Sequence, residues 1–229
     1  MRLPLPSLLL LALAALPAAA QDDGWAHAEV LLGTAWSLPT PLVVRLPGTP
    51  PTRLRARYAT RPWADAPYYA YRAGGGQGGG CAHSAGYDAE LLHHKLYLQN
   101  PVPPIEHFEV THGYNLASAG ALRPAGPLAV RLALGAVVAH AEGRVAGQKV
   151  GGIRRTFLGG GYHLAGLVAQ LAVGRRYPLG RGSTVLYAIP EAKITAAAAR
   201  VPVGDGGAAY VPNVAAHLLA GLGVCRGWR

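Results

Sequence analysis

Cysteine, methionine and phenylalanine are scarce in this sequence. Its 229 residues include 2 Cys, 1 Met and 2 Phe. The two cysteines, Cys81 and Cys225, are too few for a disulfide scaffold, and neither belongs to a Cys-x-x-Cys or Cys/His pattern of the kind that binds zinc. We therefore expect no metal and no cofactor.

Acidic residues are few as well. The chain has 11 Asp and Glu against 21 Lys and Arg, which gives a net charge of +10. A basic excess often indicates polyanionic partners. Here arginine far outnumbers lysine, and Ala, Gly and Pro are abundant, which is the bias that a GC-rich coding sequence produces by itself. We expect no nucleic-acid partner.

Long apolar runs are absent after the N-terminus, so the sequence predicts no transmembrane helix. The first 20 residues, "MRLPLPSLLLLALAALPAAA", have one basic residue, a short apolar run and a small-residue ending. This layout is typical of a secretory signal peptide. We predict a signal peptide over residues 1–20, cleavage after Ala20, and one exported domain over residues 21–229.

Sustained helical periodicity is lacking too, and strand-like segments recur between Gly- and Pro-rich breaks. Two further short segments, 41–46 and 53–59, read as a hairpin, which leaves a count of eight or ten strands open. The eight main segments are 28–36, 68–73, 87–98, 105–117, 127–141, 159–177, 183–201 and 209–226.

The segments alternate with a period of two. In 209–226, one face carries Val214, Leu218 and Leu222, whereas the other is mostly small or polar. The last segments are also longer than strands of soluble proteins usually are. Length and alternation together favour an all-β fold, a closed antiparallel up-and-down transmembrane β-barrel with apolar residues outside and polar residues inside. In "FEVTHGYNLA", residues 108–117, the apolar set from Phe108 to Leu116 is accordingly expected to face lipid.

Turn order then predicts the topology. With eight strands, both termini lie on the periplasmic side, together with the breaks 74–86, 118–126 and 178–182. The outer loops are 37–67, 99–104, 142–158 and 202–208. We read the glycine-rich break "AGGGQGGGC" as a flexible turn.

In this architecture the chain resembles the small outer-membrane β-barrel proteins of Gram-negative bacteria. The signal peptide, the eight alternating segments and the near-terminal aromatic in "GLGVCRGW" carry the resemblance. It implies a location in the bacterial outer membrane, contact with outer-membrane lipid and lipopolysaccharide, and insertion by the barrel assembly machinery. It also implies a monomer. Because many functions share this fold, the resemblance leaves the role open.

The sequence contains nine histidines, so we consider whether the protein could be an enzyme. Lipid A deacylases on this fold carry a His-x-Ser pair on one strand face, and no such pair occurs here. His93 and His94 are adjacent on a strand, so they point to opposite faces and cannot bind one metal together. We predict no catalytic residues. A lipid A- or phospholipid-directed acyl hydrolase on the same barrel stays as an alternative, and so does a secreted β-sandwich binding module.

The inward-facing polar residues are the candidate site. Because an eight-stranded barrel is only just wide enough for side chains, we expect them to form a network that fills the interior, in a protein with a structural or a small-solute- or lipid-binding role. The predicted network consists of Glu109, Thr111, Asn115, Arg131, Gln170, Glu191, Lys193 and His217.

The two cysteines both fall on the periplasmic side of this topology. Two strand spacings separate their strands, which is further than a disulfide reaches. The glycine-rich turn before Cys81 is pliant, however, and the periplasm is oxidising. A disulfide between Cys81 and Cys225 and a pair of free thiols both remain open.

Overall fold

A computed structural model describes residues 23–78, 85–151, 155–156 and 159–228. This part of the chain is all-β and contains no helix, so none of its segments is a helix that could cross a membrane. The predicted signal peptide, residues 1–20, lies outside the described residues, as does Cys81.

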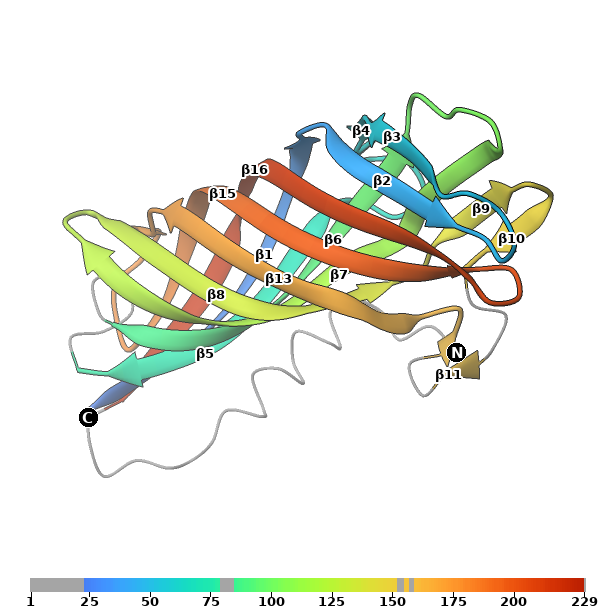
Figure 1. The fold of residues 1–229 in the computed structure, drawn as a ribbon. Helices are drawn as coiled ribbons and strands as arrows, with labels where there is room; N and C mark the ends of the chain where they lie inside the picture. Colours follow the sequence, from blue (N-terminus) through green and yellow to red (C-terminus); the bar gives the residue numbers. More distant parts are fainter. Residues whose placement is uncertain (1–22, 79–84, 152–154, 157–158, 229) are drawn as a thin grey trace.

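Eight antiparallel strands form a closed ring, in which the last strand, β16, pairs with the first, β1 (Figure 1). The predicted number and order of main strands are confirmed. Because one sheet closes on itself, the two facing sheets of the β-sandwich alternative are absent from the described residues. The ring strands are β1 (Gly24–Ser37), β5 (Tyr69–Gln77), β6 (Gly86–Leu98), β7 (Ile105–Ala125), β8 (Leu128–Ala139), β13 (His163–Gly174), β15 (Thr184–Val203) and β16 (Gly207–Trp228).

Shorter strands extend one end of the ring, which we call the loop end; the opposite end, where β1 begins and β16 finishes, is the terminal end (Figure 1). The predicted hairpin is present as the β2–β3 pair, and β2 also pairs with β16. The strands of the loop end are β2 (Thr40–Arg45), β3 (Thr52–Ala56), β4 (Tyr58–Ala59), β9 (Glu142–Val145), β10 (Gln148–Val150), β11 (Arg155–Thr156) and β12 (Gly159–Gly160). At the terminal end, β14 (Tyr177–Pro178) pairs with β15.

The glycine-rich break is shorter than the predicted turn over residues 74–86. Strand β5 continues through Gln77, and Gly76 lies opposite Trp25 of β1. A Cβ atom on Gly76 would lie 2.9 Å from the indole ring of Trp25, and one on Gly86 would lie 2.8 Å from it. Glycine at these positions therefore makes room for the large buried side chain of Trp25. Because residues 74–77 belong to strand β5, the prediction of a flexible turn is wrong for them.

The burial pattern inverts along the longest strands. In the middle of β15 the inward side chains are polar, at Glu191, Lys193 and Thr195, and the outward ones are apolar. In the loop half the inward side chains are apolar, as at Val201 and Val203, whereas Arg200 points outward. The interior thus has a polar layer in the middle of the ring and an apolar core toward the loop end, with buried apolar side chains such as Tyr187 and Ile189 also toward the terminal end.

This inversion corrects the prediction for residues 108–117. The side chains of Phe108, Val110, Tyr114 and Leu116 are at most 1 % exposed and belong to the interior core. They lie toward the loop end, where the core is apolar, so the rule of a polar inside and an apolar outside does not hold for them. Strand β7 also runs on to Ala125, and the predicted break over 118–126 shrinks to the turn at its end.

His112 does not follow its neighbours into the core. His112 is an even-numbered residue like Phe108, Val110 and Tyr114, so a regular strand would point it the same way. Its side chain is nevertheless 56 % exposed. The pairing of β6 with β7 shifts register between His94 and Leu96, and Gly113 has a φ of +130°. This irregularity turns His112 outward, where Nδ1 lies 2.8 Å from Oε1 of Glu142.

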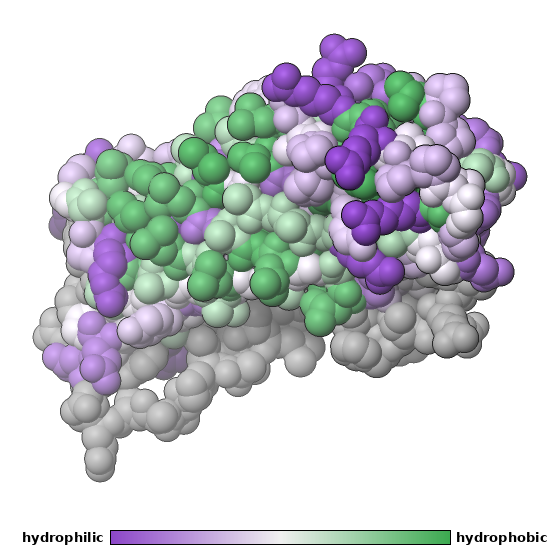
Figure 2. Space-filling model, in the orientation of Figure 1, coloured by the Kyte–Doolittle hydropathy of each residue, from purple (hydrophilic) through white to green (hydrophobic). Residues whose placement is uncertain are grey.

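Large apolar side chains cover the outside of the ring between its two ends. In Figure 2 they form a green zone over β8, β13, β15 and β16, with hydrophilic side chains at both ends. The predicted outward positions on β16 belong to this apolar zone. Its most exposed members include Leu132, Leu134, Leu164, Leu167, Ile194, Leu218 and Leu222.

Candidate functional site

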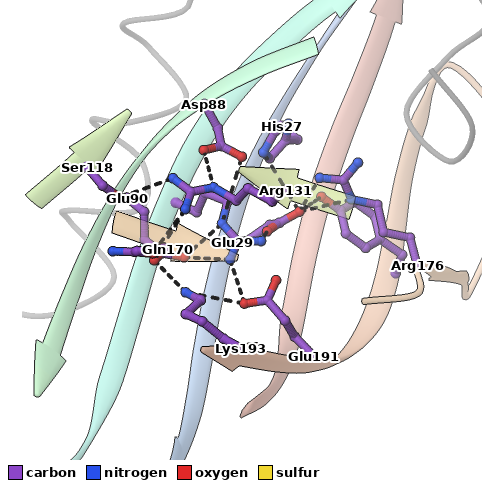
Figure 3. Close-up of polar contacts among 12 residues, drawn as sticks. His27, Glu29, Asp88, Glu90, Ser118, Arg131, Gln170, Arg176, Glu191 and Lys193 are labelled. Carbon is purple, nitrogen blue, oxygen red and sulfur yellow. Dashed lines mark hydrogen bonds and ion pairs between the residues drawn. The ribbon is translucent and has the colours of Figure 1, made fainter. Parts of the chain in front are cut away.

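Eight charged side chains meet inside the terminal half of the ring, and we call them the ion-pair cluster (Figure 3). They come from β1, β5, β6, β8, β15 and the segment that follows β13, and each side chain is at most 6 % exposed. The cluster consists of Glu29, Arg72, Asp88, Glu90, Arg131, Arg176, Glu191 and Lys193.

Arg72 is the centre of the cluster. Its Nη1 donates to Oε2 of Glu29 at 2.8 Å. Its Nη2 donates to Oε2 of Glu90 at 2.5 Å and to Oε1 of Glu191 at 2.8 Å. One guanidinium therefore joins three carboxylates from three different strands, which the five donors of its planar fork allow.

Arg131 and Lys193 bind carboxylates of β6, Asp88 and Glu90. Arg131 donates through Nε to Oδ1 of Asp88 at 2.6 Å, and its other nitrogens donate to Gln170 and Ser118. The Nζ atom of Lys193 donates to Oε1 of Glu90 at 2.5 Å. Ser118, expected in a turn, thus lies in the interior as a hydrogen-bond acceptor.

Arg176 reaches the cluster from the terminal end. It lies between β13 and β14, and its Nη2 donates to Oε1 of Glu29 at 2.7 Å. The same oxygen accepts a hydrogen bond from the Tyr187 hydroxyl at 2.9 Å. The guanidinium carbon lies 5.9 Å from the ring centre of Trp25 and 5.6 Å from that of Tyr187. Two aromatic rings and an arginine therefore close this end of the cluster.

The cluster is electrically balanced. Four carboxylates face four cationic groups, and every one of the eight has an opposite charge within 4.0 Å. A buried charge is very costly unless it is paired and hydrogen-bonded. Since each charge is already neutralised within the chain, the arrangement is suited to filling the interior and leaves no net charge to attract a solute ion.

A second polar group lies deeper in the ring, and we call it the histidine layer: Tyr68, His94, Thr195, Asn213 and His217. The Tyr68 hydroxyl bonds Nδ1 of His217. Thr195 Oγ1 lies 2.8 Å from Nε2 of the same ring, and Nε2 of His94 lies 3.1 Å from Oδ1 of Asn213. The layer adjoins the ion-pair cluster, because Lys193 and His217 are cross-strand partners.

The contact between Thr195 and His217 has the geometry of a nucleophile beside a base. Two features weaken that interpretation. The Thr195 side chain is 0 % exposed, so no substrate reaches its hydroxyl in this structure. The other ring nitrogen of His217 faces a tyrosine, whereas the hydrolytic triad uses a carboxylate to orient the histidine. The same contacts satisfy three buried polar groups, which is a structural role.

The predicted network divides into two groups. Arg131, Gln170, Glu191 and Lys193 come together around the ion-pair cluster, and His217 lies in the histidine layer.

Glu109, Thr111 and Asn115 join neither group. Glu109 lies 3.0 Å from His107 on the outside, Thr111 Oγ1 contacts Glu109, and Asn115 bonds His93 at 2.8 Å. The placement inside the ring is wrong for Glu109, because it assigned the apolar face of this segment to lipid and so sent the opposite, polar face inward. Thr111 is buried, at 3 % exposed.

Several members of the site were missed. Glu29, Arg72, Asp88 and Glu90 each alternate with apolar neighbours on β1, β5 and β6, which is the pattern that identified Glu191 and Lys193. That signal was present in the sequence. Arg176 has no such signal, since it lies outside the ring strands and enters the site from a connecting segment.

His93 and His94 point to opposite faces, as expected of neighbours on a strand. His93 stacks on Tyr69 at a centroid distance of 4.9 Å, whereas His94 is fully buried in the histidine layer. In the described ranges, no three His, Cys, Asp or Glu side chains are placed to hold a metal ion. Cys225 is disulfide-bonded; Cys81 lies outside the described residues.

The comparisons with known proteins add no relative to this picture. No protein-family model matches the chain, and no match is found among curated protein sequences.

Proposed function

We propose that this protein is a β-barrel of the bacterial outer membrane whose polar interior is filled by its own side chains, and that its role is structural rather than catalytic. The observation that carries the proposal is the uninterrupted apolar outer face of β15 and β16. Its outward residues are Leu186, Ala188, Pro190, Ala192, Ile194, Ala196 and Ala198 on β15, and Pro212, Val214, Ala216, Leu218, Ala220, Leu222 and Val224 on β16.

The length of this face suits a bilayer. On each strand it covers about 12 residue steps, or about 40 Å at about 3.3 Å per residue. A tilt of about 40° reduces this to about 30 Å of depth, close to the apolar band of about 25 Å on membrane barrels. Polar side chains bound it on both sides: Arg200 and Tyr210 toward the loop end, and Arg226 toward the terminal end.

The inversion of the burial pattern supports the same placement. Within the apolar zone, the outside is apolar and the inside holds the ion-pair cluster and the histidine layer. Beyond it, toward the loop end, the inside is an apolar core that includes Val44, Val150 and Val203, and the outward side chains include Arg53 and Arg200. A strand that passes from lipid into water requires this exchange, because its outer neighbours change from acyl chains to water.

A filled interior argues against a pore for solutes. The ion-pair cluster fills the terminal half, the histidine layer follows it, and the apolar core lies at the loop end. The contact between Thr195 and His217 gives the acyl-hydrolase alternative no support, because the Thr195 side chain is 0 % exposed. We expect neither the wild-type protein nor a Thr195→Val variant to release fatty acids from lipid A or phospholipid above the rate of empty vesicles.

Refolding into phosphatidylcholine vesicles tests the proposal. We expect the mature chain, residues 21–229, to float with the vesicles, to resist carbonate extraction and to migrate differently on a gel with and without boiling. In planar bilayers it should give no steady conductance. A chain that stays in the aqueous fraction would overturn the membrane assignment, and a stable open-channel current would overturn the filled interior.

A further inference from the structure

Basic side chains line one edge of the apolar face, at the level where β15 and β16 leave it. Arg200 of β15 lies opposite Tyr210 of β16, Tyr210 lies opposite Val43 of β2, and Val43 lies opposite Arg53 of β3. This single register row crosses four adjacent strands.

Arg45 and Arg55 flank that row. They alternate with buried or partly buried residues on β2 and β3 and are exposed, as are Arg53, Arg200 and Tyr210. The guanidinium carbon of Arg45 lies 5.4 Å from the ring centre of Tyr210. We call the set Arg45, Arg53, Arg55, Arg200 and Tyr210 the basic row.

We propose that the basic row binds the phosphate groups of a lipid head group in the outer leaflet of the membrane. The proposal rests on the membrane placement proposed above and goes beyond it, because it assigns a site and a ligand chemistry to one side of the barrel. In Figure 2, hydrophilic side chains border the green zone on this side, where β2, β15 and β16 lie.

The charges of the loop end are segregated. Acidic side chains gather on the side of β7 and β9, where Glu106, Glu109 and Glu142 have basic partners: Arg144, His107 and His112. In the described part of the chain, none of the four arginines of the basic row forms an ion pair with an acid. One carboxylate, Asp205, lies nearby in the β15–β16 turn. The row therefore carries a net positive charge of its own.

The position of the basic row along the barrel axis favours a lipid as its ligand. Arg200 is the next outward residue after Ala198, where the uninterrupted apolar face of β15 ends, so its guanidinium lies at the boundary between acyl chains and head groups. Arginine matches phosphate oxygens with its planar fork of donors. A tyrosine at the same boundary is typical of the aromatic girdle of membrane barrels. A phosphate attached to acyl chains satisfies both surfaces, whereas a free phosphate would contact only the row.

Native mass spectrometry of the detergent-solubilised barrel tests this site. The probe is lipid A carrying two phosphates, compared with the same lipid after enzymatic dephosphorylation. The variant R45Q/R53Q/R200Q removes three charges from the row. The control variant R61Q/R144Q/K149Q removes the same charge from exposed positions elsewhere at the loop end. Flotation with phosphatidylcholine vesicles is measured first for all three proteins.

We expect the row variant to bind the phosphorylated lipid about tenfold more weakly than wild type, because charge-assisted contacts to phosphate are lost. The control should bind within about twofold of wild type, and dephosphorylated lipid should bind weakly to all three proteins.

Three results would overturn the site while the membrane placement stood: equal weakening in both variants, no weakening in either, or equal affinity for the two lipids. Inorganic triphosphate that competes as strongly as the lipid would show a general anion surface and would also overturn it. A wild-type chain that does not float overturns the membrane placement, and the lipid site with it.

Discussion

The Nζ atom of Lys193 lies 2.5 Å from Oε1 of Glu90, and both side chains are 0 % exposed. The two residues belong to β15 and β6, which are not neighbours in the ring. The pair therefore crosses the interior and ties opposite walls together, which backbone hydrogen bonds between adjacent strands cannot do.

Removing the charge of Glu90 should destabilise the barrel strongly. Glu90→Gln leaves Arg72 and Lys193 with one carboxylate fewer, and breaking a buried pair on one side costs about 3–5 kcal/mol. Denaturant unfolding in lipid vesicles measures the loss. Glu106→Gln, at an exposed position of the loop end, is the control and should change stability by less than about 0.5 kcal/mol. Equal unfolding midpoints for the two variants would contradict a cluster that holds the walls together.

Adding a methyl group at Gly223 should disturb the terminal end. A Cβ atom there would lie 2.5 Å from the Tyr187 ring, which would push the hydroxyl away from Glu29. Overpacking of this kind costs about 1–3 kcal/mol. Gly180→Ala is the matched control, because a Cβ at Gly180 meets nothing within 4 Å. The prediction fails if the two glycine variants unfold at the same denaturant concentration.

An arginine should be tolerated at the edge of the apolar face but not at its centre. Leu218 lies midway along the outward residues of β16, and Val224 lies at their terminal end. Leu218→Arg should cost about 2–4 kcal/mol in vesicles, whereas Val224→Arg should cost about 0–1 kcal/mol. Folding yield and unfolding free energy in vesicles measure the difference. If both substitutions cost the same, the apolar face does not mark bilayer depth.

The Cys225 thiol should be unreactive until a reductant is added, since the residue is disulfide-bonded. A maleimide added to the unfolded, unreduced chain should leave Cys225 unmodified, and prior reduction should allow its labelling. Peptide mass spectrometry reads this one position directly. Labelling of Cys225 without reductant would show that the bond does not form. Cys225→Ser should lower the unfolding free energy by about 2–4 kcal/mol in oxidising buffer, the usual contribution of a disulfide.

The local alternation of apolar and polar residues was sufficient to predict the main strands and, for most of them, which side chains point outward. The period-two alternation on β15 and β16 placed Leu218 and Leu222 outside and Lys193 and His217 inside, and the structure has them so. The breaks that glycine and proline make in that alternation predict the eight main strands and their order, but leave a count of eight or ten open. These features depend on residues close together in the chain, so they can be deduced without knowing the fold.

The tertiary structure decided what each face meets. The alternation in β7 is equally clear, but its apolar set faces an interior core, because the loop end extends beyond the apolar zone and the interior there is closed by β2, β3, β9 and β10. A period of two says that the faces differ, not which of them is inside. Only the closed ring could bring Arg72 to three carboxylates on other strands and carry Arg176 in from a connecting segment, since such contacts are set by distance in space and not along the chain.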